Sequence, residues 1–252
     1  MKTVLFNIFL VIFLTIQIQS QQFSIGSPEW LVDMFFNQNE FPDKEKYLSG
    51  EMLDDIDELT IGEELNDNAV VLFHQVKGTE NDIVFSVEVN QDNNPVDFYC
   101  YINRSENKWK ISALRTFVLP SFIYIVRDSL SNLNNLSSND STFLLSLQLF
   151  TATDNELKNF LKTNQNNFNK LISAFINNQK DEGDKILSSI GCNAIYSDKN
   201  FPGCIFIQIL KFEDLSAGFI QAADPILLPR IAVEDFILIE EVVQGWFIYR
   251  LM

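Results

Sequence analysis

Apolar side chains recur every three or four residues between Leu157 and Ile176. The full set is Leu157, Phe160, Leu161, Phe168, Leu171, Ile172, Phe175 and Ile176. This spacing is the period of one face of an α-helix. The run Thr153-Asp-Asn-Glu156 directly before it has the pattern of a capping box, which typically begins a helix. The sequence therefore predicts a long amphipathic helix that starts at Asp154 and packs through one apolar stripe.

Four stretches earlier in the chain alternate apolar and polar residues, which is the two-residue period of a half-buried strand. They are Ala69–Lys77, Ile83–Val89, Val96–Asn103 and Trp109–Phe117. The breaks between them are short and rich in Gly, Asn and Asp, which favours antiparallel neighbours. A short helix is predicted before them, because Ser27-Pro28 resembles a helix start and apolar residues follow it at helical spacing. The first half is thus predicted to be a helix packed on a meander.

The chain returns to strands after the long helix. The predicted strands are Gly203–Phe212, Ala217–Ala222, Asp235–Val243 and Trp246–Leu251, with Gln244-Gly245 as a tight turn. We therefore predict an α+β fold with two helix-plus-antiparallel-sheet units joined by a helical middle segment. The predicted division is a first domain over residues 21–131, a linker and short helix over 132–153, and a second domain over 154–252.

The two halves show a weak internal echo. Trp109 opens a strand that carries Arg115, and Trp246 opens a strand that carries Arg250. In both halves a helix comes first and a Trp-led strand comes last. A duplicated unit is one interpretation, and coincidence is the other.

The N-terminus has the features of a secretory signal peptide over residues 1–20. Lys2 is followed by an apolar run from Val4 to Ile16, and a small residue, Ser20, stands at the expected cleavage point. An uncleaved anchor is the alternative interpretation. No cysteine precedes Cys100, which argues against a lipoprotein. We expect a secreted or periplasmic protein that keeps no stable membrane anchor after cleavage.

Composition excludes several classes of function. With 34 acidic and 18 basic residues the net charge is −16, which argues against a nucleic-acid partner. One histidine and nine glycines leave no His-rich metal site and no phosphate-binding glycine loop. The acidic stretch Glu51–Asp67 would offer oxygen ligands to calcium, but a solvated surface is the alternative and no EF-hand spacing is present. No metal and no cofactor are predicted.

His74 is the one histidine, and it shares a strand face with Val70, Leu72 and Val76. If that face lines a pocket, His74 paired with a carboxylate would be a candidate general acid or base. The alternative is a hydrogen-bonded histidine at the surface or edge of a sheet.

Export permits disulfides, and Cys192 and Cys204 flank a turn-like loop. A Cys192–Cys204 bridge and two free thiols are equally compatible with the sequence. Cys100 lies on the apolar side of a strand, so we expect it to be a buried free thiol. Tyr99 and Tyr101 lie on the other side of that strand. They are candidates for an exposed aromatic surface that binds a ligand or partner, or for residues packed against the second half.

The first half resembles the NTF2-like (cystatin-like α+β) folds through the Trp30–Phe36 helix and the closing strand Asn107–Phe117. The resemblance covers roughly residues 27–118 and includes no signature motif. The whole chain is also similar to uncharacterised exported bacterial proteins. NTF2-like folds serve as enzymes, ligand binders and interaction modules, so the resemblance implies a curved sheet around a helix but no particular activity.

These observations favour an exported soluble protein without enzymatic activity, which binds a small amphipathic ligand or a protein partner. An NTF2-like pocket enzyme that uses His74 with a carboxylate is the alternative. A structural or interaction protein without a pocket is a third interpretation.

Overall fold

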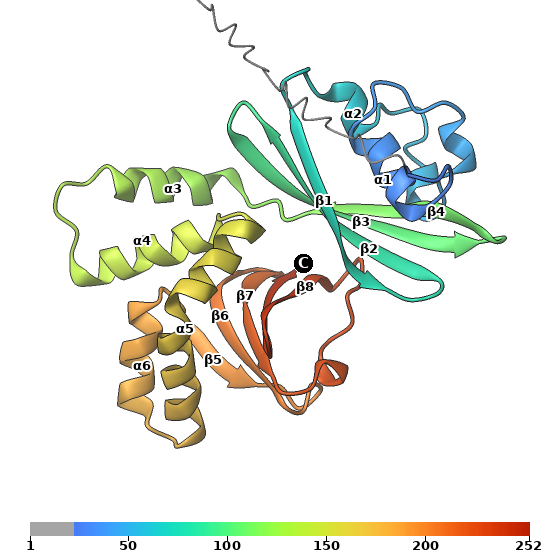
Figure 1. Cartoon of the computed structure of the whole chain (residues 1–252). Coiled ribbons are helices and arrows are strands. Elements are labelled where there is room, and N and C mark those ends of the chain that lie inside the picture. The colour runs from blue at the N-terminus through green and yellow to red at the C-terminus, as the bar shows by residue number, and fades with distance from the viewer. Residues whose placement is uncertain (1–22) are drawn as a thin grey trace, which may run out of the picture.

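The computed structural model describes residues 23–252 and confirms the α+β class (Figure 1). The predicted signal peptide, residues 1–20, lies outside the described residues. The α-helices within them are α1 (Pro28–Phe36), α2 (Ile61–Glu64), α3 (Ser121–Ser131), α4 (Ser138–Phe150), α5 (Asp154–Ile176) and α6 (Lys180–Ser189). Short 3₁₀ turns at Lys44–Lys46, Gly50–Leu53 and Pro225–Leu227 complete the helical elements. None of the helices in this part of the chain is both long and apolar enough to cross a membrane.

The first sheet is the predicted meander. Its strands follow one another in sequence order and pair antiparallel: β1 (Val70–Gly78), β2 (Asp82–Gln91), β3 (Asn94–Ser105) and β4 (Lys108–Thr116). Asp92-Asn93 and Glu106-Asn107 make the last two turns, and all four residues have positive φ. Two successive left-handed residues match the twist of the flanking strands, which is why Asn and Asp are favoured there.

α1 covers one face of this sheet. The Ser27 side chain accepts a hydrogen bond from the Trp30 backbone N–H at 3.2 Å, and Pro28 occupies the first turn, as the sequence predicts. Leu31 and Phe36 on α1 are fully buried in one hydrophobic cluster with Cys100 of β3. The expectation that Cys100 is a buried free thiol is confirmed.

The second sheet has five strands: β5 (Ala194–Ser197), β6 (Cys204–Phe212), β7 (Leu215–Ala222), β8 (Phe236–Val243) and β9 (Trp246–Leu251). Their order is β5-β6-β7-β9-β8, so the last strand lies between β7 and β8. Gly245 at φ +76° turns β8 into β9, as predicted. The first sheet keeps its strands in sequence order, so the internal echo does not extend to strand topology. The sequence analysis did not predict β5 or α6.

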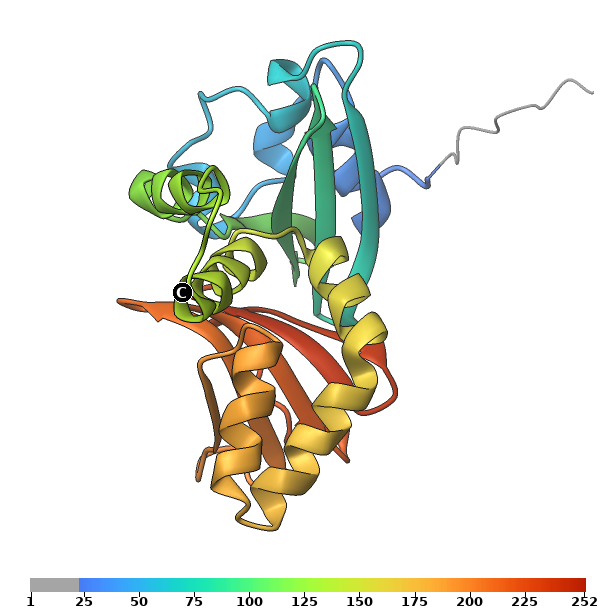
Figure 2. The same cartoon turned by 90° about the vertical axis from the view of Figure 1, so that its left-hand side faces the viewer.

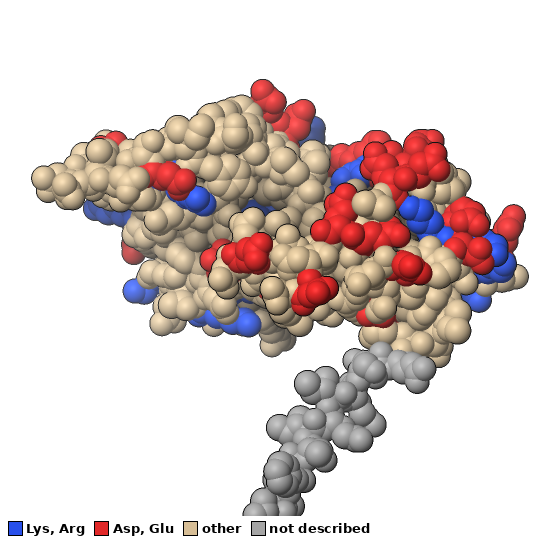
Figure 3. All heavy atoms as spheres, turned by 90° about the horizontal axis from the view of Figure 1, so that it is seen from above, with Lys and Arg blue, Asp and Glu red and all other residues tan. Residues whose placement is uncertain are grey.

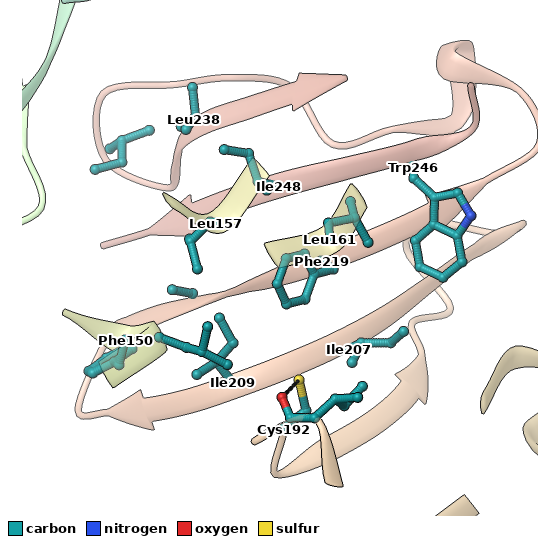
Figure 4. Close-up of a cluster of buried hydrophobic side chains, with 14 of the residues drawn as sticks. Phe150, Leu157, Leu161, Cys192, Ile207, Ile209, Phe219, Leu238, Trp246 and Ile248 are labelled. Atoms are coloured by element: carbon teal, nitrogen blue, oxygen red, sulfur yellow. Dashed lines mark hydrogen bonds between the residues drawn. The ribbon is translucent and has the colours of Figure 1, made fainter. Parts of the chain in front are cut away.

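α5 is the predicted long helix, and it covers one face of the second sheet (Figure 4). Both hydrogen bonds of the capping box at Thr153 and Glu156 are present. Leu157 and Leu161 pack with Phe219 of β7 among fully buried side chains. The amphipathic stripe is therefore the core of the second unit.

The two units share one hydrophobic cluster. Buried side chains of the first sheet, among them Val84 and Tyr101, belong to the same cluster as Ile207 and Ile248 of the second sheet. Figure 2 shows α5 running from the first sheet down across the second, with α3 and α4 as a neighbouring pair. The segment predicted as linker and short helix, 132–153, is the turn between these two helices followed by α4. It is packed structure, since Leu147 and Phe150 are buried in the shared cluster.

Cys192 and Cys204 do not form the bridge that the sequence left open. Both thiols are free and buried, and burial raises the pKa of each. Cys192 belongs to the cluster that faces α5, whereas Cys204 belongs to a separate cluster with Phe206 and Tyr249. Cys204 and Phe206 alternate with Ile207 and Ile209, which face α5, so the two thiols pack on opposite faces of the second sheet.

Candidate functional site

A half-open cavity of about 460 Å³ lies where the two sheets meet the junction of α4 and α5. It is lined by the start of β3, the end of β4, α3, the α4–α5 junction and β9. The side chains that the following argument uses are Asp97, Phe117, Tyr124, Arg127, Glu156 and Arg250. Clefts between structural units are common places for ligands, so this cavity is the natural starting point.

Asp97, Tyr99 and Arg250 form the floor of the cavity, and Asp154 lies beneath them, hydrogen-bonded to all three. It is the first residue of α5, where an acidic side chain interacts favourably with the helix dipole. Its carboxylate is buried and accepts two hydrogen bonds: from the Tyr99 hydroxyl at 2.9 Å and from Arg250 Nε at 3.1 Å.

Arg250 joins the end of α4 to the start of α5. Besides Asp154, its guanidinium donates to the carbonyl oxygens of Phe150 (3.4 Å) and Ala152 (2.6 Å), and it lies over the Phe117 ring, 4.7 Å from the centroid. Burial is the largest single effect and favours the neutral form, but the charges of Asp154 and its neighbours, together with the hydrogen bond to Asp154, outweigh it, so the pKa of Arg250 is raised. The guanidinium therefore stays charged while buried, with carbonyls at a helix C-terminus as acceptors.

Tyr99 completes this network from the first sheet. Its side chain is fully buried, and burial followed by the negative charge of Asp154 raises its pKa well above the ordinary value. The hydroxyl therefore stays protonated and serves as a donor to Asp154. The first sheet, α5 and the second sheet are thus joined through one carboxylate.

Asp97 is the second carboxylate at the cavity floor. Its Oδ2 accepts the backbone N–H of Asp154 at 2.8 Å, so it caps the start of α5 from a neighbouring strand. Burial, and then the charge of Asp154, raise the pKa of Asp97 to about 7, although the backbone hydrogen bond and Arg250 act in the opposite direction. A carboxyl group that titrates near neutrality in a cavity is a typical mark of a functional site.

The floor holds more negative than positive formal charge. Asp97 and Asp154 face a single buried guanidinium, that of Arg250. The N-terminus of α5 contributes only about half a positive charge. A negative charge is therefore left over whenever Asp97 is ionised.

Arg127 on α3 forms part of the outer wall. It donates to Asp128 through Nε (2.9 Å) and to the Thr151 hydroxyl through Nη1 (2.9 Å), and it lies over the Tyr124 ring. Its charge is thus already paired with Asp128 at the mouth of the cavity.

A second cavity, of about 530 Å³, lies between the acidic N-terminal segment and β4. Arg115 and Glu51 form an ion pair at its wall, and Arg115 also donates to the Val233 carbonyl at 3.1 Å. Most of the charged residues around it are acids: Asp54, Asp55, Glu58 and Glu64. Within residues 23–252 no three His, Cys, Asp or Glu residues gather closely enough to hold a metal ion.

His74 pairs with a carboxylate, but outside the cavities described above. Its Nε2 lies 2.9 Å from Oε1 of Glu240 on β8, and Lys158 of α5 lies 2.6 Å from the same oxygen. Burial is the largest single effect and favours the neutral acid, but these two hydrogen bonds together with the charges of their donors outweigh it, so the pKa of Glu240 is lowered. The side of β1 that packs under α1 carries Phe73, so His74 faces away from α1 and toward the second unit. The structure matches the alternative that the sequence left open, a hydrogen-bonded histidine at the surface of a sheet, here in a contact between the two sheets.

Tyr99 and Tyr101 do not form an exposed aromatic surface. Both are buried, because the face of β3 that carries them packs against the second unit, which was the alternative left open by the sequence. The Tyr101 hydroxyl donates to the Ile237 carbonyl at 3.0 Å, and Tyr99 lines the cavity.

The most apolar exposed surface belongs to α3, α4 and their flanks. Its exposed large side chains are Val118, Phe122, Tyr124, Ile125, Val126, Leu133 and Phe143. Only Arg127, Asp128 and Asp140 are charged between residues 118 and 150. Figure 3 shows few charged side chains on the left, over these helices, and many acidic ones on the right.

A comparison of the chain with protein-family models, curated proteins and solved structures finds no match. The NTF2-like resemblance of the first half therefore remains a prediction. Any functional argument rests on the geometry of the sites themselves.

Sequence reasoning did not single out Asp97 or Asp154 as site residues. The network at the floor joins Asp97 and Tyr99 of β3, Asp154 of α5 and Arg250 of β9. These residues are far apart in the sequence; Tyr99, for example, lies 55 positions before Asp154. The available signal was a charged residue inside an otherwise apolar strand, as at Arg250 in Trp246–Leu251. Such a residue is buried only when paired, so it predicts that a partner exists but not which one.

Proposed function

We propose that this chain is an exported binding protein without enzymatic activity, and that its ligand is a small amphipathic molecule held in the cavity at the α4–α5 junction. The observation that carries the proposal is the combination of a cavity of about 460 Å³ with a buried, charged hydrogen-bond network at its floor. Export rests on the signal-like residues 1–20. The lining combines charged and other polar side chains with aromatic ones, so it suits a ligand that has both a polar group and an apolar body.

The chemistry of the lining supports an amphipathic ligand. Phe117 and Tyr124 supply aromatic surface, while Asp97 and Glu156 supply carboxylates. Arg250 and Asp154 hold each other and their helix ends, so they are positioned to shape the floor and not to react.

The alternative, an enzyme that uses His74 with a carboxylate, has one supporting observation: the contact between His74 and Glu240. Lys158 binds the same carboxylate oxygen, and none of the cavities described above includes the pair. General acid–base work needs a place for substrate within hydrogen-bond reach of the base. The binding interpretation therefore has the stronger support.

Native mass spectrometry of the protein, exported by its own N-terminal segment, tests the proposal. We expect an excess mass that disappears on denaturation. Pro95→Trp places an indole on the face of β3 that carries Asp97 and Tyr99, so it should fill the cavity and abolish the excess mass, whereas Val118→Trp, on the exposed surface beside the cavity, should leave it unchanged. A clean mass for the parent protein, or an excess mass that survives in Pro95→Trp, would contradict the proposal.

A further inference from the structure

The charge excess at the cavity floor points to the kind of ligand. Within residues 23–252, Arg250 supplies the one guanidinium close to the carboxylates of Asp97 and Asp154. This guanidinium donates one hydrogen bond to Asp154 and its others to the carbonyl oxygens of Phe150 and Ala152. Asp154 accepts from two side-chain donors, whereas Asp97 accepts one hydrogen bond from the described residues, through Oδ2 from a backbone N–H. Asp97 is therefore the carboxylate at the floor whose charge is left without a cation.

The walls of the cavity do not supply the missing cation. Arg127 is paired with Asp128 and hydrogen-bonded to Thr151. Glu156, the other acid in the lining, accepts the backbone N–H of Thr153 within the capping box and adds a second negative charge near the mouth. An anionic ligand would meet two carboxylates at the start of α5, the place where a free helix N-terminus would otherwise attract it.

We propose that the cavity takes a small organic cation, a primary ammonium compound with an apolar or aromatic body, and that its ammonium group binds Asp97. This inference rests on the proposed binding function and names its ligand class. The ammonium would donate to the Asp97 carboxylate, and the body of the ligand would pack on Phe117 and Tyr124. An ammonium is preferred to a metal ion because no group of three metal-ligating side chains exists in the described residues.

Binding of such a cation is coupled to a proton. The charged or titratable groups around Asp97 are Asp154 and Glu156 on α5, Arg250 on β9, Tyr99 on β3 and Glu88 on β2, and Arg127 on α3 lines the same cavity. Burial, and then the charge of Asp154, disfavour the ionised form and raise the pKa of Asp97 to about 7, so Asp97 is largely protonated below neutrality. An ammonium ligand would displace that proton to solvent, and the Asp97 carboxylate would take the ligand in its place.

Three probes of similar shape and different charge test the inference: 2-phenylethylammonium, 2-phenylethanol and 3-phenylpropionate. Titrations followed by NMR at pH 8 should show the ammonium probe binding at least tenfold more tightly than either of the others. Its affinity should fall about tenfold between pH 8 and pH 6, because the fraction of ionised Asp97 falls by that factor around a pKa of about 7. Calorimetry in two buffers at pH 6 should detect release of nearly one proton on binding.

Asp97→Asn should remove both the preference for the ammonium probe and its pH dependence. Glu88→Gln is the matched control, since Glu88 contributes to the charge around Asp97 but does not line the cavity. It should keep the preference within about twofold. Thermal melts of both variants establish that they are folded.

Several outcomes would overturn the inference. They are equal binding of the ammonium and the alcohol, tighter binding of the carboxylate, an unchanged preference in Asp97→Asn, or the absence of binding by all three probes. If native mass spectrometry nevertheless finds a ligand lost in Pro95→Trp, the proposed function stands and only the ligand class is wrong. If neither experiment finds binding, both fail together.

Discussion

Arg115 and Arg250 lie on the two Trp-led strands, β4 and β9, and each pairs with one carboxylate. Arg115 meets Glu51 at the surface, where the two side chains are 22% and 42% exposed. Arg250 meets Asp154 in the interior, where the values are 3% and 2%. Water screens the first pair, so its contribution to stability is small. The second pair has no water to replace a lost partner, so the loss of either side chain is costly. The same pair, with the hydrogen bonds around it, connects the two sheets with α4 and α5 beside the cavity.

Removal of Arg250 should have the largest effect. Arg250→Met leaves Asp154 buried and uncompensated, and it frees the carbonyls of Phe150 and Ala152. We expect the free energy of unfolding to fall by about 3–5 kcal/mol, the usual cost of breaking a buried pair. Chemical denaturation measures it.

A double variant makes this prediction independent of whether Arg250→Met folds. Arg250→Met combined with Asp154→Leu removes both charges, and it should recover at least half of the loss. A double variant that is less stable than Arg250→Met would show that the pair is not the source of the effect.

Tyr99→Phe should have the next largest effect. The substitution keeps the ring in the core but removes the hydroxyl that donates to Asp154 at 2.9 Å. Hydrogen bonds to charged groups contribute about 1.5–3 kcal/mol, so we expect a loss of about 2 kcal/mol. Tyr47→Phe is the comparison at a half-buried tyrosine with no hydroxyl bond in the structure, and it should change stability by less than about 0.5 kcal/mol. Equal losses in the two variants would contradict the prediction.

Asp97→Asn should increase stability, and only at higher pH. The folded state raises the pKa of Asp97 from 3.8 to about 7, so this group favours folding fully below pH 3.8 and loses that contribution as the pH rises through 7. The Asn carbonyl still accepts the Asp154 N–H without carrying charge. We expect a gain of about 1–2 kcal/mol at pH 8 and little change at pH 4, measured by urea denaturation at both values. A loss of stability at pH 8 would contradict the excess of negative charge around Asp97.

Arg115→Met should have the smallest effect. The pair with Glu51 is solvent-accessible, so we expect a change of less than about 1 kcal/mol, reduced further by added salt. Thermal melts at low and high salt measure it. A loss as large as that in Arg250→Met would remove the distinction between the two pairs.

Local pattern predicted those parts of the fold that local physics decides. The stripe from Leu157 to Ile176 and the capping box at Thr153 predicted α5 with its correct start, and alternation with Asn- and Asp-rich turns predicted the first sheet. β5 was missed because four residues are too few to show a period. The position of β9 between β7 and β8 was also unpredicted, since strand order depends on which edges meet in the folded chain.

The candidate site was less accessible to sequence reasoning. The floor joins Asp97, Asp154 and Arg250, and its contacts span 57 and 96 positions. No spacing rule connects residues at such separations. His74 was a candidate because it is the one histidine in the chain. The number of histidines does not indicate which face of β1 lines a cavity. The structure instead places it opposite Glu240, between the two sheets.

The most direct test of the charge excess is the titration of Asp97 itself. Carbon-detected NMR of the side-chain carboxyl groups, with Asp97→Asn to assign the signal, gives its pKa in the folded protein. We predict a midpoint near 7, set by burial and by the charge of Asp154. A midpoint at or below the ordinary 3.8 would show that the cavity floor already holds enough positive charge, and it would contradict the assignment of a cationic ligand.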